Sequence, residues 1–277
     1  MENEIDTRNQ NLNAIQNYIC LSEFRRPLFN SIIKSLDLPN GSKGLDAGCG
    51  IGFYTKTLAE SVGANGNVIG LDLSKDFITY ANKNRVQNIQ FEESDINSLH
   101  FKDKSFDWIW SADTVWPGPK ELGCPTEDPT TIIKEFYRIL KPGGMIIILF
   151  WSTQKFLPGY PLLEARLNTT SGATAPFIHG MNPINHIMNA KHWLEKVGFK
   201  NILAKTFLAD INAPLDENTR NALNIFFQMF WGESESQVSE EDWNEFKRLC
   251  DSNSDDNVLN NPYYYGFYTY TLFRGVK

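Results

Sequence analysis

The chain has 277 residues, 42% of them hydrophobic, and a net charge of −7. This length and apolar content can fill one large domain, whereas the acidic balance disfavours the phosphate contacts on which nucleic-acid binding depends. The four cysteines lie far apart, so neither a zinc site nor a disulfide framework is indicated and no metal is expected. The acidic N-terminus lacks an apolar run, and the longest such run, Met145–Trp151, is too short to cross a bilayer. A cytoplasmic protein with no membrane partner is therefore expected.

The first predicted elements are one or two helices over residues 13–38, followed by a short apolar strand near 44–47. The strand runs directly into three glycines at alternate positions, Gly48, Gly50 and Gly52, and a helix pattern over 52–63 begins at once. Glycines in such a turn let the backbone bend sharply and let a ligand approach it, and the N–H groups of the new helix favour an anionic group. The sequence predicts a nucleotide-type pocket at this turn.

The spacing of these glycines argues against a dinucleotide site. In the fingerprint G-x-G-x-x-G the third glycine would stand at position 53, which is Phe. The loop also follows Asp46, a carboxylate that would repel a diphosphate and attract an ammonium group. A ligand with an amine, a carboxylate and an adenosine but no phosphate fits better, and S-adenosylmethionine is such a ligand. A nicotinamide-dependent oxidoreductase is the alternative for this fold.

Two further strands also lead to acidic residues. The strand over 67–72 ends in Asp72, at the distance from the glycine loop where a ribose-binding carboxylate is expected, and Ser74 is a plausible N-cap for a helix over 75–85. A strand near 88–93 leads to Asp95. Acids that only cap the following helices are the plain alternative. Ligands of open α/β sheets, however, bind at these strand ends.

The later elements continue the alternation of strands and helices. A strand near 106–111, a helix near 127–140 and a strand near 144–151 indicate a parallel sheet covered on both faces. Residues 152–188 are too long for a structureless connection, so they are predicted to be a functional insertion. The rest comprises a helix ended by Gly198, a strand over 201–210, a helix over 218–231, a capping box at Ser239–Asp242 and an aromatic strand over 263–274.

Taken together, the motifs resemble the class I S-adenosylmethionine-dependent methyltransferases, most closely the group that includes quinone-biosynthesis and natural-product enzymes. The segments that carry the resemblance are D-x-G-x-G-x-G at 46–52, FD-x-x-x-S at 106–111, R-x-L-K-P-G-G at 138–144 and W-L-x-x-x-G-F at 193–199. The resemblance implies a Rossmann-like, seven-stranded, mostly parallel α/β sheet with helices on both faces, and a last strand that runs antiparallel beside the fifth. It implies one domain over 1–277, with an N-terminal helical segment (1–40), a cofactor-binding core (41–151) and helical substrate-side insertions over the active site (152–188 and 212–262).

The resemblance also implies which residues hold S-adenosylmethionine and its product S-adenosylhomocysteine. Asp72 would bind the ribose, and Asp95 the adenine amino group, with Ile96 against the ring. Cys49 is interpreted as a small residue that fits the loop rather than as a reactive thiol. The complete expected set is Asp46, Gly48, Cys49, Gly50, Gly52, Asp72, Leu73, Asp95, Ile96, Ser111 and Ala112.

The acceptor side carries weaker signals, because the cofactor supplies the difficult chemistry and the protein supplies orientation and electrostatics. The candidate catalytic bases are Asp113, just past the fourth strand, and His179 in the first insertion. Their plain alternatives are turn capping for Asp113 and a surface position for His179. The expected substrate pocket includes Tyr18, Arg25, Trp116 and Phe177.

The predicted function is in-line methyl transfer to a small, partly apolar molecule. The alternatives are methylation of a macromolecule, protein or RNA, and a non-catalytic S-adenosylmethionine-binding protein. Residues 111–116 lack an Asn-Pro-Pro-Tyr-type motif, which disfavours methylation of a nucleic-acid base. The acceptor and the oligomeric state are not indicated.

Overall fold

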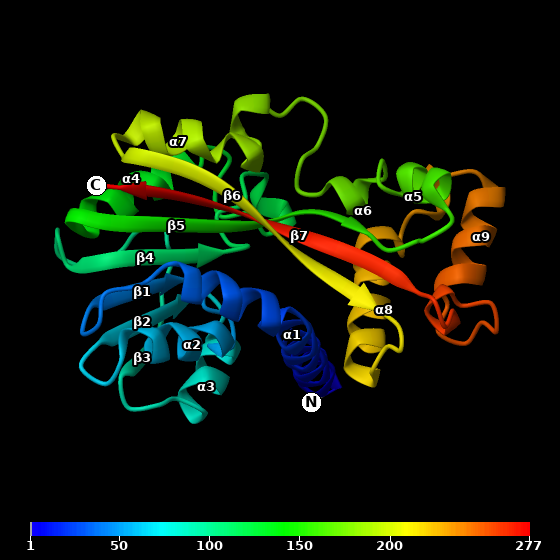
Figure 1. The fold of residues 1–277 in the computed structure, drawn as a ribbon, viewed down its shortest axis with the longest axis horizontal. Coiled ribbons are helices and arrows are strands. Elements are labelled where there is room, and N and C mark those ends of the chain that lie inside the picture. The colour runs from blue at the N-terminus through cyan, green and yellow to red at the C-terminus, as the bar shows by residue number, and fades with distance from the viewer. Residues whose placement is uncertain (1) are drawn as a thin grey trace.

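The computed structural model describes the backbone of residues 2–277 and the side chains from residue 13 on. Its centre is a seven-stranded sheet in the order β3-β2-β1-β4-β5-β7-β6 (Figure 1). Neighbouring strands are parallel except at β7, which lies antiparallel between β5 and β6. The predicted sheet, with its last strand inserted beside the fifth, is confirmed. The strands are β1 (Lys43–Ala47), β2 (Asn67–Asp72), β3 (Ile89–Glu93), β4 (Phe106–Ala112), β5 (Leu140–Lys155), β6 (Lys200–Asn212) and β7 (Tyr265–Val276).

Helices cover both faces of the sheet. The helices are α1 (Glu2–Ser35), α2 (Phe53–Val62), α3 (Lys75–Lys83), α4 (Thr130–Ile139), α5 (Pro161–Leu167), α6 (Ser171–Thr174), α7 (Ala190–Val197), α8 (Glu217–Trp231) and α9 (Glu240–Cys250). Helices α1, α2 and α3 lie on one face, and α4 and α7 on the other (Figure 1). Strand β5 shows why both faces need cover: Ile147 and Leu149 belong to the core of the first face, Ile146 and Ile148 to that of the second.

Two strands are longer than predicted. Strand β5 continues to Lys155, so the first residues of the segment 152–188 form a strand and not an insertion. It pairs with β7 along this extension, from Trp151 opposite Tyr270 to Lys155 opposite Phe267. Strand β6 likewise runs to Asn212 against β7. A partner strand distant in sequence sets both lengths, and local sequence patterns do not contain that information.

Two of the predicted helix ends are confirmed, and one is partly wrong. The Ser74 hydroxyl accepts the N–H of Phe77, and Gly198 ends α7 in a left-handed conformation. The Ser239 hydroxyl accepts the N–H of Asp242 as a capping box requires. The Asp242 carboxylate, however, pairs with Arg166, at 2.6 and 2.7 Å, instead of completing the box.

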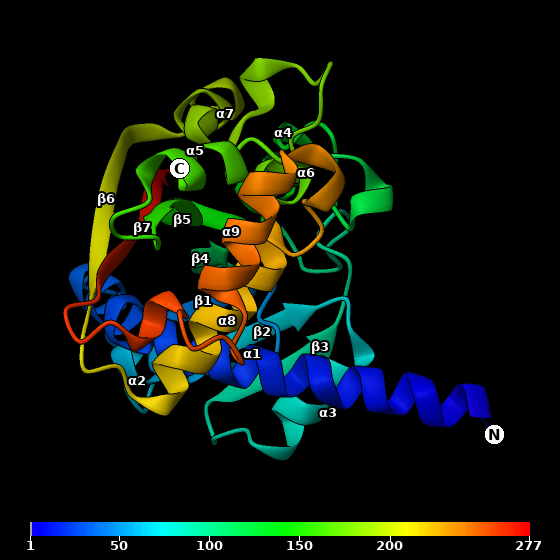
Figure 2. The same ribbon diagram turned by 90° about the vertical axis from the view of Figure 1, so that its right-hand side faces the viewer.

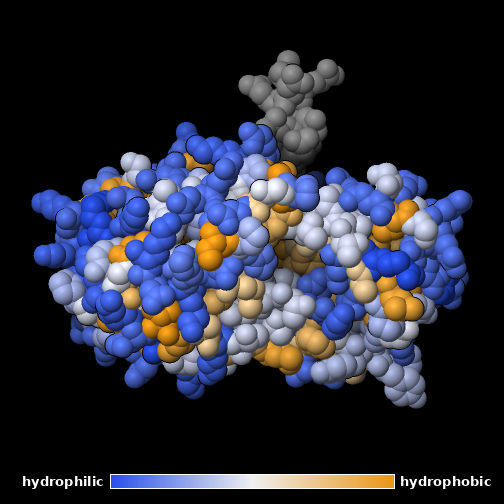
Figure 3. Space-filling view, turned by 90° about the horizontal axis from the view of Figure 1, so that it is seen from above, coloured by the Kyte–Doolittle hydropathy of each residue, from blue (hydrophilic) through white to orange (hydrophobic). Residues whose placement is uncertain are grey.

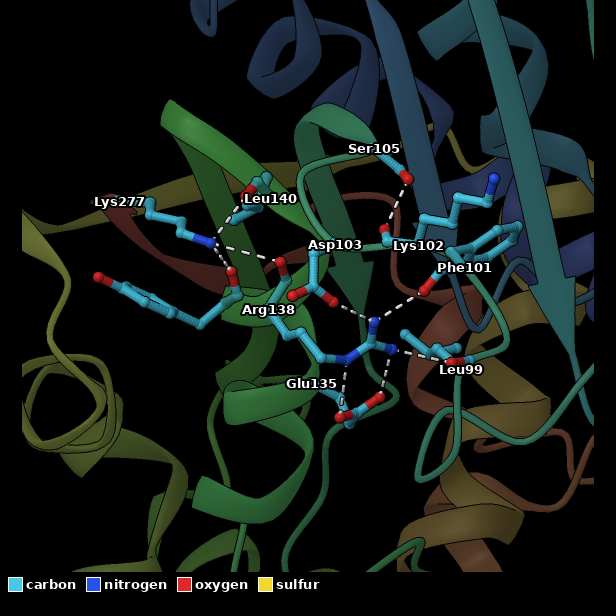
Figure 4. Close-up of polar contacts among 10 residues, drawn as sticks. Leu99, Phe101, Lys102, Asp103, Ser105, Glu135, Arg138, Leu140 and Lys277 are labelled. Atoms are coloured by element: carbon cyan, nitrogen blue, oxygen red, sulfur yellow. Dashed lines mark hydrogen bonds and ion pairs between the residues drawn. The ribbon is translucent and has the colours of Figure 1, made fainter.

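The R-x-L-K-P-G-G turn has a structural role, because its Arg138 links two segments of the chain (Figure 4). The Arg138 guanidinium donates to the carbonyls of Leu99 and Phe101 at 2.9 and 2.7 Å, and it pairs with Glu135 and Asp103. It therefore fastens the loop before β4 to the end of α4, at the amino ends of the parallel strands and opposite the glycine loop.

The remaining helices gather beyond the carboxyl ends of the strands. Figure 2 looks at this end, where α8 and α9 stand in front of the sheet and α1 runs past α3. Seen from above, the surface is hollowed between the end that carries α7 and the end that carries α5 and α9 (Figure 3). No helix in the described part of the chain is long and apolar enough to cross a membrane.

Candidate active site

The glycine loop that follows β1 requires glycine at two positions for both conformation and space. Gly48, Gly50 and Gly52 all have left-handed backbones, with φ of 83°, 55° and 76°. A Cβ atom on Gly48 would lie 2.0 Å from the Thr114 hydroxyl oxygen, and one on Gly52 would lie 2.4 Å from the Phe91 ring. Gly50 is different: among the described side chains, the nearest atoms to its position for a Cβ belong to the Tyr18 ring, at 3.8 and 3.9 Å. The described residues therefore leave more room at Gly50 than at Gly48 or Gly52, and the Tyr18 ring borders this space.

Asp72, at the end of β2, holds this loop. One carboxylate oxygen accepts the N–H of Gly50 at 2.8 Å, and the other accepts the N–H of Ser74 at 2.9 Å. The second bond is the expected local turn, whereas the first crosses to the glycine loop. Each oxygen keeps a further acceptor position, which fits the hydroxyl groups of a ribose. The neighbouring Leu73 is 71% exposed, and Tyr18 of α1 lies over Gly50, with its ring centroid 4.6 Å from that of Phe77.

Asp46 is a buried acid with only one hydrogen-bond partner in the described structure. It is 3% exposed and accepts the hydroxyl of Thr55 at 2.6 Å. Burial raises the pKa of Asp46 to about 7, and the nearby Asp72 adds to the effect. No side chain from residue 13 onward forms an ion pair with it. A buried carboxyl of this kind fits a ligand that brings a positive charge, such as the ammonium group of S-adenosylmethionine.

The other predicted cofactor residues divide into exposed and internal ones. Asp95 is exposed, and one of its oxygens accepts the Asn97 N–H at 2.8 Å, which leaves the other oxygen available. Ile96 and Ser111 have buried side chains, and the Ser111 hydroxyl donates to the carbonyl of Ala47 at 3.0 Å. Ser111 is 0% exposed and Ile96 only 6%, so neither offers much surface to a cofactor in this structure. Burial raises the pKa of the Cys49 thiol, which agrees with a packing role in the loop.

A second polar cluster forms where β4 ends. Asp113 has a left-handed backbone, with φ of 49°, and one of its oxygens accepts the N–H of Trp151 at 2.9 Å. Its other oxygen accepts the Tyr270 hydroxyl at 2.6 Å and lies 3.4 Å from Nη1 of Arg25. Arg25 also donates to the Tyr270 oxygen at 2.9 Å. Residues from α1, β5 and β7 thus meet at the carboxylate that directly follows β4.

The Asp113 cluster is shielded but open on one side. The side chains of Arg25 and Asp113 are 14% and 25% exposed, and Tyr270 is fully buried. Burial raises the pKa of Asp113, while Arg25 and the two hydrogen bonds act in the opposite direction. The structure thus brings together two residues that the sequence suggested separately, Asp113 as a candidate base and Arg25 as a pocket residue. The sequence does not identify Tyr270, because nothing in the pattern of the aromatic strand shows which hydroxyl reaches a partner.

The remaining acceptor-side candidates lie elsewhere. Trp116 and Phe177 contact each other, with ring centroids 6.3 Å apart, and pack against the core of the α4 and α7 face. His179 is exposed and makes no hydrogen bond or ion pair with the Asp113 cluster in the described structure. Among residues 13–277, no group of three His, Cys, Asp or Glu side chains is placed to hold a metal ion.

Comparison with known proteins identifies the family. A family model described as a methyltransferase domain matches residues 38–198. A demethylmenaquinone methyltransferase from Lactobacillus johnsonii is 33% identical over 192 residues, which cover 61% of this chain and 72% of that protein. One from Staphylococcus epidermidis is 34% identical over 120 residues, 43% of this chain and 46% of the relative, so the chain spans about half the length of that relative.

Solved structures agree on the fold. The YcgJ protein of Bacillus subtilis superposes with a TM-score of 0.52 at 16% identity, covering 90% of this chain and 97% of that one. This likeness supports the architecture, while the family match over more than half of the chain supports the assignment. With its glycine loop and its acids at the ends of β1 and β2, the chain belongs to the class I S-adenosylmethionine-dependent methyltransferases.

Proposed function

We propose that this protein transfers the methyl group of S-adenosylmethionine to a small, partly apolar acceptor. The observation that supports this most directly is Asp72, which anchors the glycine loop at Gly50 and keeps acceptor positions for ribose hydroxyls. When bound, the cofactor supplies a methyl group already activated by its sulfonium charge. The protein therefore has to bind, orient and deprotonate, and orientation alone is worth about 7–11 kcal/mol.

Each strand end has a separate role in this proposal. Asp46 receives the ammonium group, Asp72 the ribose hydroxyls and Asp95 the adenine amino group. Leu73 offers an exposed apolar surface beside the adenosine. The loop residues Gly48, Cys49, Gly50 and Gly52 contribute backbone. Ile96 is proposed beside the adenine ring, and Ser111, whose hydroxyl binds the Ala47 carbonyl, supports the site from β4 together with Ala112.

Asp113 is proposed as the general base. A carboxylate has about four acceptor positions. Trp151, Tyr270 and Arg25 fill three of them, and the side chain is 25% exposed on its open side. An acceptor O–H or N–H bond breaks there, the proton moves to the carboxylate, and the electron pair stays on the acceptor for attack on the methyl carbon. His179 is the weaker candidate, since it lies exposed and outside the cluster.

The relatives' names favour a quinol-like acceptor. Proteins named demethylmenaquinone methyltransferases match this chain at 33% and 34% identity. Such a molecule has the ionisable group that Asp113 requires and apolar surface for an aromatic pocket. Tyr18, Arg25, Trp116 and Phe177 are the proposed pocket residues. The parts of segments 152–188 and 212–262 that follow β5 and β6 are the proposed substrate-side insertions on a single domain over 1–277. Residues 1–40 and 41–151 would be its N-terminal helical segment and cofactor core.

A net charge of −7 supports a small molecule over nucleic acid, and we propose a cytoplasmic location. Methylation of a protein or an RNA, and cofactor binding without catalysis, are the alternatives. Labelled-methyl transfer to a reduced demethylmenaquinone, a total RNA fraction and a protein fraction distinguishes the three. Transfer to the quinol alone is the expected result, and transfer to RNA alone would contradict the proposal.

Calorimetry tests the cofactor site independently of any acceptor. S-adenosylhomocysteine and S-adenosylmethionine are expected to bind, and NAD is not. Asp72→Ala should weaken S-adenosylhomocysteine binding by more than tenfold, because hydrogen bonds to a charged group are lost. Asp107→Ala is the matched control, since Asp107 lies in β4 and binds Lys43 and Lys141 away from the loop. Tight NAD binding with no response to the other two ligands would refute the cofactor assignment.

A further inference from the structure

Tyr270 occupies an unusual position for a tyrosine hydroxyl. It is fully buried and lies between a carboxylate and a guanidinium group. The hydroxyl donates to Asp113 at 2.6 Å and accepts from Arg25 at 2.9 Å. Its ring is fixed on two sides, 4.9 Å from Phe29 and 5.5 Å from Trp151 between centroids, both in edge-on geometry. The hydroxyl therefore has little freedom to turn away from the carboxylate.

The cluster is assembled from distant parts of the chain. Arg25 is anchored within α1, since its Nε donates to the carbonyl of Leu21 at 3.0 Å. Tyr270 is paired with Trp151 in the β5–β7 register, and the N–H of Trp151 binds the other Asp113 oxygen. Both carboxylate oxygens are thus held by groups that cannot move independently of the sheet.

We infer that Tyr270, together with Arg25, is a positioning residue that keeps Asp113 ionised and aimed at the methyl acceptor. The inference rests on the proposed role of Asp113 as the base. A carboxylate that accepts two or three hydrogen bonds is stabilised in its charged form, whereas burial alone favours the neutral acid. A base that is protonated at working pH cannot accept a proton from the acceptor.

Several groups face Asp113 and affect the balance between its charged and neutral forms. Arg25 and Tyr18 approach from α1, Tyr54 from α2 and Tyr270 from β7, while β5 contributes the Trp151 N–H. Arg25 is the only cation among them, and it too depends on Tyr270, whose oxygen accepts one of its hydrogen bonds. Because Arg25 and Tyr18 belong to α1, the base is complete only while that helix is packed against the core.

Strand β7 supplies a matched control. Tyr268 lies two residues before Tyr270 on the same face, is equally buried, and stacks on Trp151 at 4.9 Å, but its hydroxyl donates to no described residue. Tyr270→Phe and Tyr268→Phe therefore remove the same atom from the same strand. Only the first removes a hydrogen bond to Asp113.

The test compares the pH dependence of kcat/KM for these two variants, with labelled methyl transfer to the reduced quinol as the assay. In Tyr270→Phe the acidic limb should move up by about one pH unit, with kcat falling more than KM changes. Tyr268→Phe should retain the wild-type profile. Equal profiles for the two variants, or equal shifts, would overturn the inference and leave Tyr270 a packing residue.

A second readout needs no turnover. Without ligands, the loss in Tm caused by Tyr270→Phe should be larger at pH 8 than at pH 5, because a higher pKa of Asp113 in the folded state reduces stability as pH rises. The loss caused by Tyr268→Phe should be the same at both pH values. Asp113→Asn distinguishes an error about the base from an error about Tyr270: if this variant retains turnover while binding S-adenosylhomocysteine, the proposed base is wrong. If it abolishes turnover while Tyr270→Phe shows no pH effect, only the inference about Tyr270 is wrong.

Discussion

Replacing Asp46 by asparagine should stabilise the free protein at alkaline pH. Asp46 is buried without a cationic partner in the described structure, and its pKa is about 7 instead of 3.8. Between these values the folded state binds more protons than the unfolded state, so stability falls as pH rises through this window. Asparagine carries no charge, and its carbonyl oxygen can still accept the Thr55 hydroxyl.

The magnitude follows from the size of the shift. A difference of about 3 pKa units corresponds to a penalty of about 4 kcal/mol at pH 8, where both states are ionised. At pH 5 the folded carboxyl keeps its proton, and the penalty is only about 1.6 kcal/mol. Relative to the wild type, Asp46→Asn should therefore gain about 2–3 kcal/mol between pH 5 and pH 8, equivalent to about 5 °C or more in Tm.

Thermal unfolding of the ligand-free protein at both pH values measures this difference. Asp107→Asn is the control: although burial disfavours its charge, hydrogen bonds from Lys141 and the Lys43 N–H lower its pKa. The stability that the Asp107 carboxylate contributes is present above the unfolded pKa of 3.8. It should therefore change little between pH 5 and pH 8. An Asp46→Asn variant whose Tm difference from the wild type is the same at both pH values would refute the reasoning.

Two further substitutions separate binding from folding. Leu73→Ser should change the free energy of unfolding by less than about 0.5 kcal/mol, because Leu73 is 71% exposed, but it should weaken S-adenosylhomocysteine binding in calorimetry. An unchanged affinity would exclude Leu73 from the cofactor site. Gly52→Ala should lower stability in urea unfolding by about 2–4 kcal/mol, since φ is 76° and the new methyl group would meet the Phe91 ring at 2.4 Å. A loss below about 0.5 kcal/mol would mean that the loop does not need glycine there.

The parts of the fold that the sequence predicted are those with local signals. The parallel part of the sheet could be inferred because strands such as β1, β2 and β4 are short apolar runs, each followed by turn residues. Gly48, Gly50 and Gly52 were recognisable because left-handed backbone selects glycine. Asp72 was located by its distance from the loop, which reflects the length of one strand–helix–strand unit.

The Asp113 cluster could not be predicted in the same way. Tyr270 is 157 residues from Asp113 in sequence, and Arg25 is 88 residues from it. Alternation along a strand shows which residues share a face, so Tyr268 and Tyr270 are equivalent by pattern. Only the packing of α1, β5 and β7 determines that the Tyr270 hydroxyl binds a carboxylate while the Tyr268 ring stacks on Trp151 and its hydroxyl has no described partner.

The two acids Asp46 and Asp113 differ in their surroundings, and the difference supports a different partner for each. Burial raises the pKa of both Asp46 and Asp113, but Asp113 already has Arg25 as a cationic neighbour, and Asp46 has none in the described structure. A ligand ammonium group therefore gains most at Asp46, where it relieves an uncompensated charge. At Asp113 a second cation would be repelled by Arg25, while a neutral hydroxyl can donate to the open side of the carboxylate. Divergent environments of paired titratable groups commonly mark distinct roles. On this reasoning, we propose that the amino-acid end of the cofactor lies at β1 and the uncharged acceptor at the end of β4.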